Sequence, residues 1–292
     1  MVKVYNHLHW GLWDITGKPE LINLVGFCLE PGFFEICDDI NEADVIMTDY
    51  PTVEAGIVKL NNLKKFYIVF NFEKTVNPSC FSDAPNVFNI GFFHKHDKSC
   101  AWLSLYFEFF IELSEFGELS EPICDLQNFE ERYNNWSCYC YRRLYPFRSE
   151  ILKYYEGHPF RTCGMYSPID FYKQKLSIME KYLFYLPIEN GDQPFYVTEK
   201  LYEAVMSGCI PIYWGGNYRL YSPFNPERII TINSFENSFR KIPIRSWLKD
   251  KLEEIFNKPL LRPDWKEWLN DVKKQVEFKF MRKWLIFEKG KI

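Results

Sequence analysis

Short runs of β-branched and aromatic residues recur along this 292-residue chain and alternate with stretches of helical periodicity. The runs occupy residues 45–47, 66–70, 137–141, 209–214 and 228–232. Such runs are typical of strands, and a helix is the usual connection between successive strands of a parallel sheet. The alternation therefore predicts an α/β protein in which helices cover parallel sheets.

The length of the chain predicts two domains. It exceeds the usual size of a single domain, and its hydrophobic content of 47% is enough for two cores. A polar stretch from 115 to 135, rich in glutamate and aspartate, separates the first set of runs from the second. We therefore place the boundary there, with an N-terminal domain over residues 1–125 and a C-terminal domain over residues 126–292.

The C-terminal stretch has the pattern of a long amphipathic helix. Its apolar stripe consists of Trp265, Trp268, Leu269, Val272 and Val276, with lysines on the other faces. Residues 241–292 carry 14 Lys/Arg against 8 Asp/Glu, so a weak peripheral contact with an anionic membrane is one interpretation. A helix that folds back and braces the domains is the other, and the Trp/Val stripe favours it.

Composition excludes several classes of partner. The net charge of −4 and the pI near 5.8 give no chain-wide basic field for binding nucleic acid. The nine cysteines form no Cys-x-x-Cys pair, which indicates reduced thiols rather than zinc or redox sites. Residues 1–7 lack the apolar core of a signal peptide, and no apolar run approaches the roughly 20 residues of a membrane span. We therefore expect a cytoplasmic protein, peripheral to a membrane if the basic helix binds one.

The most informative segment is 189–216, which has the pattern of a strand end, a loop, a helix and a second strand. Thr198 is a good N-cap, and Gly208 is suited to end the helix. Lys200 falls in the first helical turn, where a cation opposes the helix dipole, and a bound phosphate would explain its presence. The alternative is an ordinary α/β crossover with solvated charges.

Three stretches of this region resemble the signature of the alpha-1,3-fucosyltransferase family: residues 184–190, 196–200 and 208–215. Flanking segments at 146–148, 224–226 and 230–235 are also similar, so the resemblance covers 135–236 well and the N-terminal half weakly. It implies the GT-B fold, with two Rossmann-like domains facing a cleft and a C-terminal helix returning to the N-terminal domain. It also implies a donor site in the C-terminal domain and an acceptor site mostly in the N-terminal one.

The resemblance assigns donor contacts to Arg148, Asn190, Tyr196, Glu199 and Lys200. Arg148 and Lys200 would neutralise the diphosphate and stabilise the leaving nucleotide. Glu199 would accept hydrogen bonds from ribose or sugar hydroxyls, and Asn190 and Tyr196 would orient the donor. Core packing is the alternative for Tyr196. Residues 193–195, Gln-Pro-Phe, depart from the small or acidic residues usual in the family, so the fit of the loop to the donor sugar is open.

The catalytic base implied by the resemblance is Glu73, which follows the run at 66–70. Inverting transfer requires a carboxylate that takes the proton of the acceptor hydroxyl on the face opposite the leaving diphosphate. The alternative is a solvated glutamate paired with Lys74.

We expect no metal and no cofactor. The chain contains no Asp-x-Asp pair to bridge a metal to a diphosphate. The pairs His7/His9 and His94/His96 lack a further ligand at a suitable spacing.

Together these features predict an inverting glycosyltransferase that moves fucose from GDP-fucose to a hydroxyl of an oligosaccharide or glycan acceptor, in an α-1,3 linkage. Two alternatives stay open: a related transferase that uses another GDP-hexose, and a non-catalytic protein that binds sugar nucleotides. A dinucleotide-dependent oxidoreductase is disfavoured because no Gly-x-Gly-x-x-Gly follows a strand.

Overall fold

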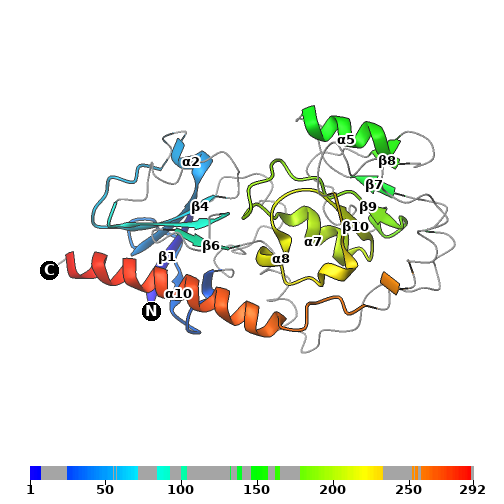
Figure 1. The fold of residues 1–292 in the computed structure, drawn as a ribbon. Coiled ribbons are helices and arrows are strands. Elements are labelled where there is room, and N and C mark those ends of the chain that lie inside the picture. The colour runs from blue at the N-terminus through cyan, green and yellow to red at the C-terminus, as the bar shows by residue number, and fades with distance from the viewer. Residues whose placement is uncertain are drawn as a thin grey trace. The chain divides into compact units, whose positions relative to one another are not determined.

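The computed structural model describes residues 1–7, 25–54, 56, 58–71, 84–92, 100–103, 132, 137–139, 146–156, 162–164, 178–232, 252, 254–255 and 258–290. The chain divides into two compact units, each with its own sheet (Figure 1). The first unit combines Met1–Glu118 with Lys266–Ile292, and the second is Leu119–Trp265.

The first unit contains a six-stranded parallel sheet with the strand order β2-β1-β3-β4-β5-β6. The strands are β1 (Val2–His7), β2 (Phe34–Ile36), β3 (Val45–Asp49), β4 (Phe66–Asn71), β5 (Val87–Gly91) and β6 (Cys100–Trp102). A short helix, α2 (Tyr50–Glu54), follows β3. Every residue of β3, β4 and β5 is buried, as expected for central strands covered on both faces.

The last helix of the chain, α10 (Trp265–Gly290), packs on this N-terminal sheet. The ring of Phe280 lies edge-on to the rings of Phe66 and Phe88, with centroids 5.8 and 5.6 Å apart. The Nζ atoms of Lys279 and Lys283 donate to the carbonyls of Cys100 and Ala84, at 2.8 and 3.2 Å. The helix therefore returns to the N-terminal unit.

The position of α10 corrects the domain boundary drawn from the sequence. That boundary assigned all of 126–292 to the second domain, whereas 266–292 belongs to the first unit. The reason is the apolar stripe of α10, whose buried residues are Val276, Phe280, Trp284 and Phe287. Such a stripe must cover an apolar surface, and the N-terminal sheet provides one.

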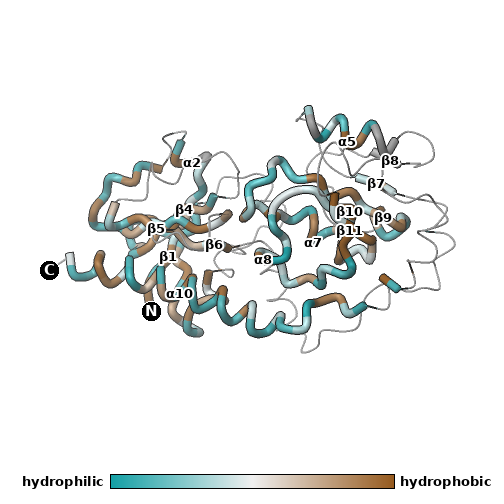
Figure 2. Tube along the Cα trace, in the orientation of Figure 1, coloured by the Kyte–Doolittle hydropathy of each residue, from teal (hydrophilic) through white to brown (hydrophobic). Residues whose placement is uncertain are grey.

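The second unit contains a five-stranded sheet with the order β11-β10-β9-β7-β8, in which all pairings are parallel. Its strands are β7 (Ser137–Tyr139), β8 (Thr162–Gly164), β9 (Phe184–Tyr185), β10 (Ile210–Tyr213) and β11 (Ile230–Thr231). The helices described in this unit are α5 (Pro146–Glu156), α7 (Glu199–Met206), α8 (Tyr218–Tyr221) and the 3₁₀ helix η4 (Pro226–Arg228). The core gathers aliphatic and aromatic side chains of β9, β10 and α5, and the hydrophobic colour follows β9 and β10 in Figure 2.

One predicted strand begins later than expected. The run 228–232 was interpreted as a strand, but Arg228 ends η4 and β11 starts at Ile230. Asn225 caps η4 by accepting a hydrogen bond from the Glu227 amide at 3.0 Å, and Pro226 occupies the first position of the 3₁₀ helix.

Candidate functional site

The candidate site lies where the chain leaves β9 and enters α7 through the loop 189–198. Past β9, Ile188 forms an isolated parallel bridge with Trp214, and the Glu189 amide donates to the Trp214 carbonyl at 2.9 Å. Thr198 is the N-cap of α7, as predicted, and its Oγ1 accepts the Lys200 amide at 3.4 Å. The loop thus brings a carboxylate and a helix N-terminus together.

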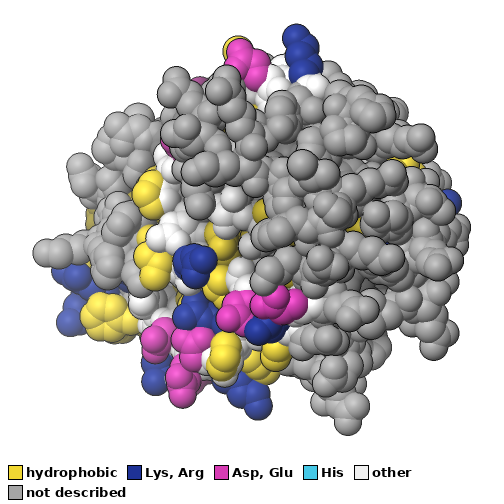
Figure 3. Space-filling model, turned by 45° about the vertical axis from the view of Figure 1, so that its right-hand side comes forward, with side chains coloured by type: hydrophobic (Ala, Val, Ile, Leu, Met, Phe, Trp, Pro, Cys, Tyr) yellow, Lys and Arg dark blue, Asp and Glu magenta, His cyan; other side chains and the backbone are white. Residues whose placement is uncertain are grey.

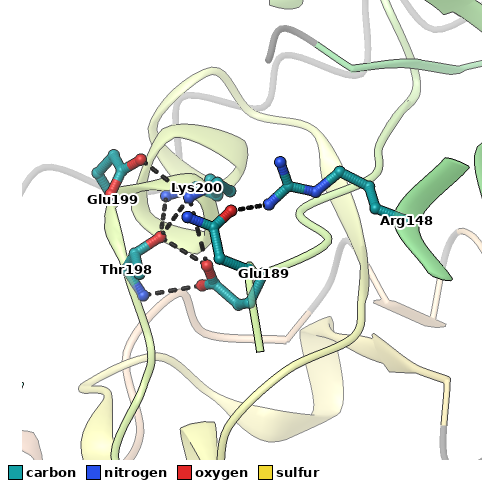
Figure 4. Close-up of polar contacts among 6 residues, drawn as sticks. Arg148, Glu189, Thr198, Glu199 and Lys200 are labelled. Atoms are coloured by element: carbon teal, nitrogen blue, oxygen red, sulfur yellow. Dashed lines mark hydrogen bonds and ion pairs between the residues drawn. The ribbon is translucent and has the colours of Figure 1, made fainter. Parts of the chain in front are cut away.

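Glu189 is completely buried and carries three contacts through its carboxylate. Its Oε1 accepts the Thr198 amide at 2.8 Å, and its Oε2 accepts the Thr198 hydroxyl at 2.7 Å. Its Oε2 also lies 3.4 Å from Lys200 Nζ (Figure 4). Burial raises the pKa of the Glu189 carboxyl, and the Lys200 charge and the Thr198 bonds oppose that rise.

Lys200 is 6% exposed, and its ammonium has three acceptors. Nζ donates to Thr198 Oγ1 at 2.9 Å, to Glu199 Oε1 at 3.0 Å and to Glu189 Oε2 at 3.4 Å. Burial alone would lower the pKa of Lys200, but Glu199 and Glu189 outweigh it, so the net pKa is raised. The side chain is therefore a fixed cation at the start of a helix.

Arg148 and Asn190 form a second polar pair beside this cluster. Arg148 comes from the first turn of α5, is 2% exposed, and donates from Nη2 to the Oδ1 of Asn190 (Figure 4). Asn190 directly follows Glu189, so the loop after β9 presents one side chain to each cation. The structure thus places four of the five predicted donor residues in two neighbouring polar groups, Arg148 with Asn190 and Glu199 with Lys200.

Tyr196, the fifth predicted donor residue, is 2% exposed. Its phenol is close enough to Lys200 to help raise the pKa of that ammonium. Its backbone forms a turn, because its amide donates to the Gln193 carbonyl at 2.9 Å, and its carbonyl accepts the Gly216 amide at 3.2 Å. Burial of this degree favours the packing alternative for the ring, and the donor contact stays a prediction.

Two glycines leave room for this arrangement. A Cβ at Gly215 would lie 2.3 Å from Glu189 Cγ and 2.6 Å from the Tyr213 hydroxyl. A Cβ at Gly216 would lie 2.6 Å from the carbonyl oxygens of Gln193 and Tyr196. The Trp-Gly-Gly segment after β10 therefore lets the backbone approach both Glu189 and the unusual Gln-Pro-Phe loop.

Several predicted residues lie outside the described part of the chain: the base candidate Glu73, its neighbour Lys74, and His9, His94 and His96. Within the described ranges, no group of three or more His, Cys, Asp or Glu side chains is placed to hold a metal ion. No helix in those ranges is long and apolar enough to cross a membrane.

The two units, each built on a parallel sheet, have the fold of solved alpha1,3-fucosyltransferases. The fold of the chain matches that of an alpha1,3-fucosyltransferase solved with GDP, with a TM-score of 0.61 and 18% identity over 94% of this chain and 90% of that one. A structure of an alpha1,3-fucosyltransferase with GDP-fucose gives a TM-score of 0.57 at the same identity and coverage. The predicted α/β fold of two Rossmann-like units is thereby confirmed.

The sequence of the second unit is similar to one particular family. Residues 134–242 match the model of the glycosyltransferase family 10 (fucosyltransferase) C-terminal domain. The same region resembles the alpha-(1,3)-fucosyltransferase FucT of Helicobacter pylori, with 32% identity over 100 residues, or 33% of this chain and 21% of that protein. The second unit is therefore similar to a fucosyltransferase C-terminal domain over residues 134–242, which confirms the resemblance inferred from the signature. The match spans about a fifth of the length of that relative.

Proposed function

We propose that this chain transfers fucose from GDP-fucose to a hydroxyl of a glycan acceptor, in an α-1,3 linkage. The observation that carries the proposal is the buried Lys200 ammonium at the N-terminus of α7, beside the Arg148–Asn190 pair. This group lies inside the segment that matches the fucosyltransferase domain.

The chemistry of the group suits a nucleoside diphosphate. The first amides of α7 and the Lys200 ammonium lie together at the start of the helix, and the Arg148 guanidinium contacts Asn190 in the preceding loop. As the glycosidic bond stretches, negative charge grows on the leaving diphosphate, and Lys200 and Arg148 would stabilise it. Glu199, whose side chain is 38% exposed, would exchange its contact with Lys200 for a hydroxyl of the donor.

We assign the role of general base to Glu73, in a reaction that inverts the anomeric carbon. The support is the likeness of the stretch 66–74 to the family and the position of Glu73 two residues after the end of β4. A parallel α/β sheet places its ligands at the carboxyl ends of its strands, and Glu73 follows such an end.

We further propose that the reaction needs no metal and no cofactor. The support is the absence of an Asp-x-Asp pair from the sequence, together with the two cations of the donor site. Turnover should then survive EDTA. Complete loss in EDTA that manganese restores would contradict this part of the proposal.

The proposal of a weak membrane contact rests on the outer face of α10. Phe278, Leu285 and Ile286 are 68%, 51% and 50% exposed, and Arg282 and Lys289 are exposed on the same helix. Charges of both signs are intermixed with apolar side chains on the described surface in Figure 3, so any attraction to anionic lipid would be modest. Flotation with anionic and neutral liposomes tests this contact, and failure to float with either refutes it.

The experiment for the activity is incubation of the chain with GDP-fucose and an array of oligosaccharides, with products identified by mass spectrometry and linkage analysis. We expect the addition of one fucose in an α-1,3 linkage. A parallel panel of GDP-hexoses tests the alternative donor. Binding of GDP without transfer or donor hydrolysis would favour the non-catalytic alternative.

A further inference from the structure

We propose that Glu189 is a positioning residue of the donor site, whose carboxylate fixes the Lys200 ammonium directly and through the Thr198 hydroxyl. This inference rests on the proposed function, because it concerns the cation that would bind the donor diphosphate. It gives a role to a buried acid that the sequence signature did not single out.

The contacts of Glu189 form a closed network with one bridging hydroxyl. Thr198 Oγ1 donates to Glu189 Oε2 at 2.7 Å and accepts from Lys200 Nζ at 2.9 Å. The second carboxylate oxygen accepts the Thr198 amide at 2.8 Å. Glu189 thus holds both the residue that caps α7 and the cation in the first turn of α7.

Burying this carboxylate is costly, which argues against a role in packing alone. Glu189 is fully buried, and an apolar or amide side chain of similar size would fill the same space without a desolvated charge. Two of its three contacts come from Thr198, and the third offsets the remaining cost only while Lys200 stays charged and in place. The structure therefore couples the carboxylate to the position of the ammonium.

The two carboxylates that contact Lys200 differ in their exposure. The Glu189 side chain is fully buried, whereas the Glu199 side chain is 38% exposed. An incoming phosphate can displace Glu199 from Lys200, because that contact reaches solvent, but it cannot displace Glu189 without opening the core. Glu189 and Thr198 would then hold the ammonium while Glu199 gives way to the donor.

The backbone after β10 also closely approaches the Glu189 side chain. Gly215 lies so close that a Cβ there would come within 2.3 Å of Glu189 Cγ. The Glu189 amide also donates to the Trp214 carbonyl, next to this glycine. The Trp-Gly-Gly segment therefore leaves room for the Glu189 side chain in the orientation that reaches Thr198 and Lys200.

The test is a double-mutant cycle of Glu189→Gln and Lys200→Ala, measured as kcat/KM for GDP-fucose and as GDP affinity. If Glu189 acts through Lys200, Glu189→Gln lowers kcat/KM by roughly 10- to 100-fold in the wild-type background, but by less than about threefold in Lys200→Ala. A purely structural role would produce similar losses in both backgrounds. That outcome, or no loss in the wild-type background, overturns the inference.

A second pair of variants covers the possibility that Glu189→Gln folds poorly. Thr198→Val removes the hydroxyl that both bridges Glu189 to Lys200 and caps α7, and Thr198→Ser keeps that hydroxyl. We expect Thr198→Val to reproduce the loss of kcat/KM and Thr198→Ser to restore most of it. Equal activity of the two variants would contradict the bridging role.

Glu180→Gln serves as the control for the substitution itself, because Glu180 is an exposed glutamate of the same unit. It should leave kcat/KM near the wild-type value, and a loss equal to that of Glu189→Gln would contradict a specific role for Glu189. A wild-type chain that does not bind GDP would overturn the proposed function itself. If the wild-type chain binds and turns over GDP-fucose but the effects of Glu189→Gln and Lys200→Ala are additive, only the inference about Glu189 is overturned.

Discussion

At the scale of single residues, the site depends on the hydrogen bonds made by the buried Lys200 ammonium. Lys200 has three protons and three acceptors, so its side chain is fixed before any ligand binds. A preorganised cation needs no rearrangement of its own when charge develops on a leaving group, and this is the main advantage of such sites in catalysis.

The residue-scale prediction for catalysis concerns Glu73. A sugar hydroxyl is a poor nucleophile at neutral pH, so Glu73→Gln should lower kcat by roughly 10²–10⁴-fold. GDP affinity should be nearly unchanged, because Glu73 is assigned to the acceptor hydroxyl and not to the diphosphate.

The kcat and the GDP affinity of Glu73→Gln are measured on one preparation, whose melting temperature should match that of the wild type. The exposed carboxylate variant Glu227→Gln provides the control. Near-wild-type kcat in Glu73→Gln would place the base elsewhere.

Gly215 gives a prediction about the space around Glu189. Gly215→Ala places a Cβ against Glu189 Cγ and the Tyr213 hydroxyl, so it should destabilise the chain by about 1–3 kcal/mol and weaken GDP binding. Gly26→Ala is the control, because no atom lies within 4 Å of its added Cβ. Thermal unfolding and calorimetry compare the two variants. Equal stability would mean that the site tolerates the added methyl group.

The residues of the site differed in how far they could be predicted. Lys200 was identifiable because a lysine in a first helical turn opposes the dipole, and Thr198 because it is a good N-cap. Glu189 was missed as a site residue, since its burial depends on the backbone of Gly215, 26 positions later in the sequence. The only local signal was a glutamate at the end of an apolar strand, which is common in solvated positions.

At the scale of elements, α10 is the clearest case of a segment whose place depends on distant partners. Its buried Phe280 contacts rings from β2, β4 and β5. The helical periodicity was visible in the sequence, but the surface that the stripe covers was not. The family resemblance indicated the return to the N-terminal unit, and the boundary placed by the polar stretch 115–135 did not include it.

Two phenylalanines on this helix provide a matched test of its packing. Phe280→Ala should destabilise the chain by about 3–5 kcal/mol, because Phe280 is fully buried. Phe278→Ala should have little effect, because Phe278 is 68% exposed. Denaturant unfolding measures both, and similar losses in the two variants would contradict the packing described here.

The reactivity of the Cys28 thiol provides a chemical test of the packing of α10. Burial raises the pKa of its thiol to about 12, with Lys273 of α10 opposing the rise. At pH 8 the thiol is therefore neutral as well as inaccessible, and iodoacetamide should leave it unmodified in the native chain. Peptide mapping should show modification of Cys28 to increase in Phe280→Ala but not in Phe278→Ala. Rapid modification in the wild type would contradict the burial of this thiol.

At the scale of the whole molecule, the alternation of apolar runs and helical periodicity predicted parallel α/β architecture, and the length of the chain predicted two domains. Neither predicted the strand orders, β2-β1-β3-β4-β5-β6 and β11-β10-β9-β7-β8. Strand order depends on long-range pairing, for which a single sequence gives no local signal. The proposed activity likewise needs the whole chain, because the donor residues belong to one unit and the base candidate to the other.

The most direct test of the account is calorimetric titration of GDP into the whole chain and into Lys200→Ala, with Lys258→Ala as a control. Lys258 forms an exposed pair with Glu227, with 36% and 64% of the side chains accessible, so its loss should not affect binding. We predict that the wild type and the control bind GDP equally, and that Lys200→Ala weakens binding by about 1.5–3 kcal/mol. Unchanged GDP affinity in Lys200→Ala, or no binding by the wild type, would contradict the donor site at the start of α7.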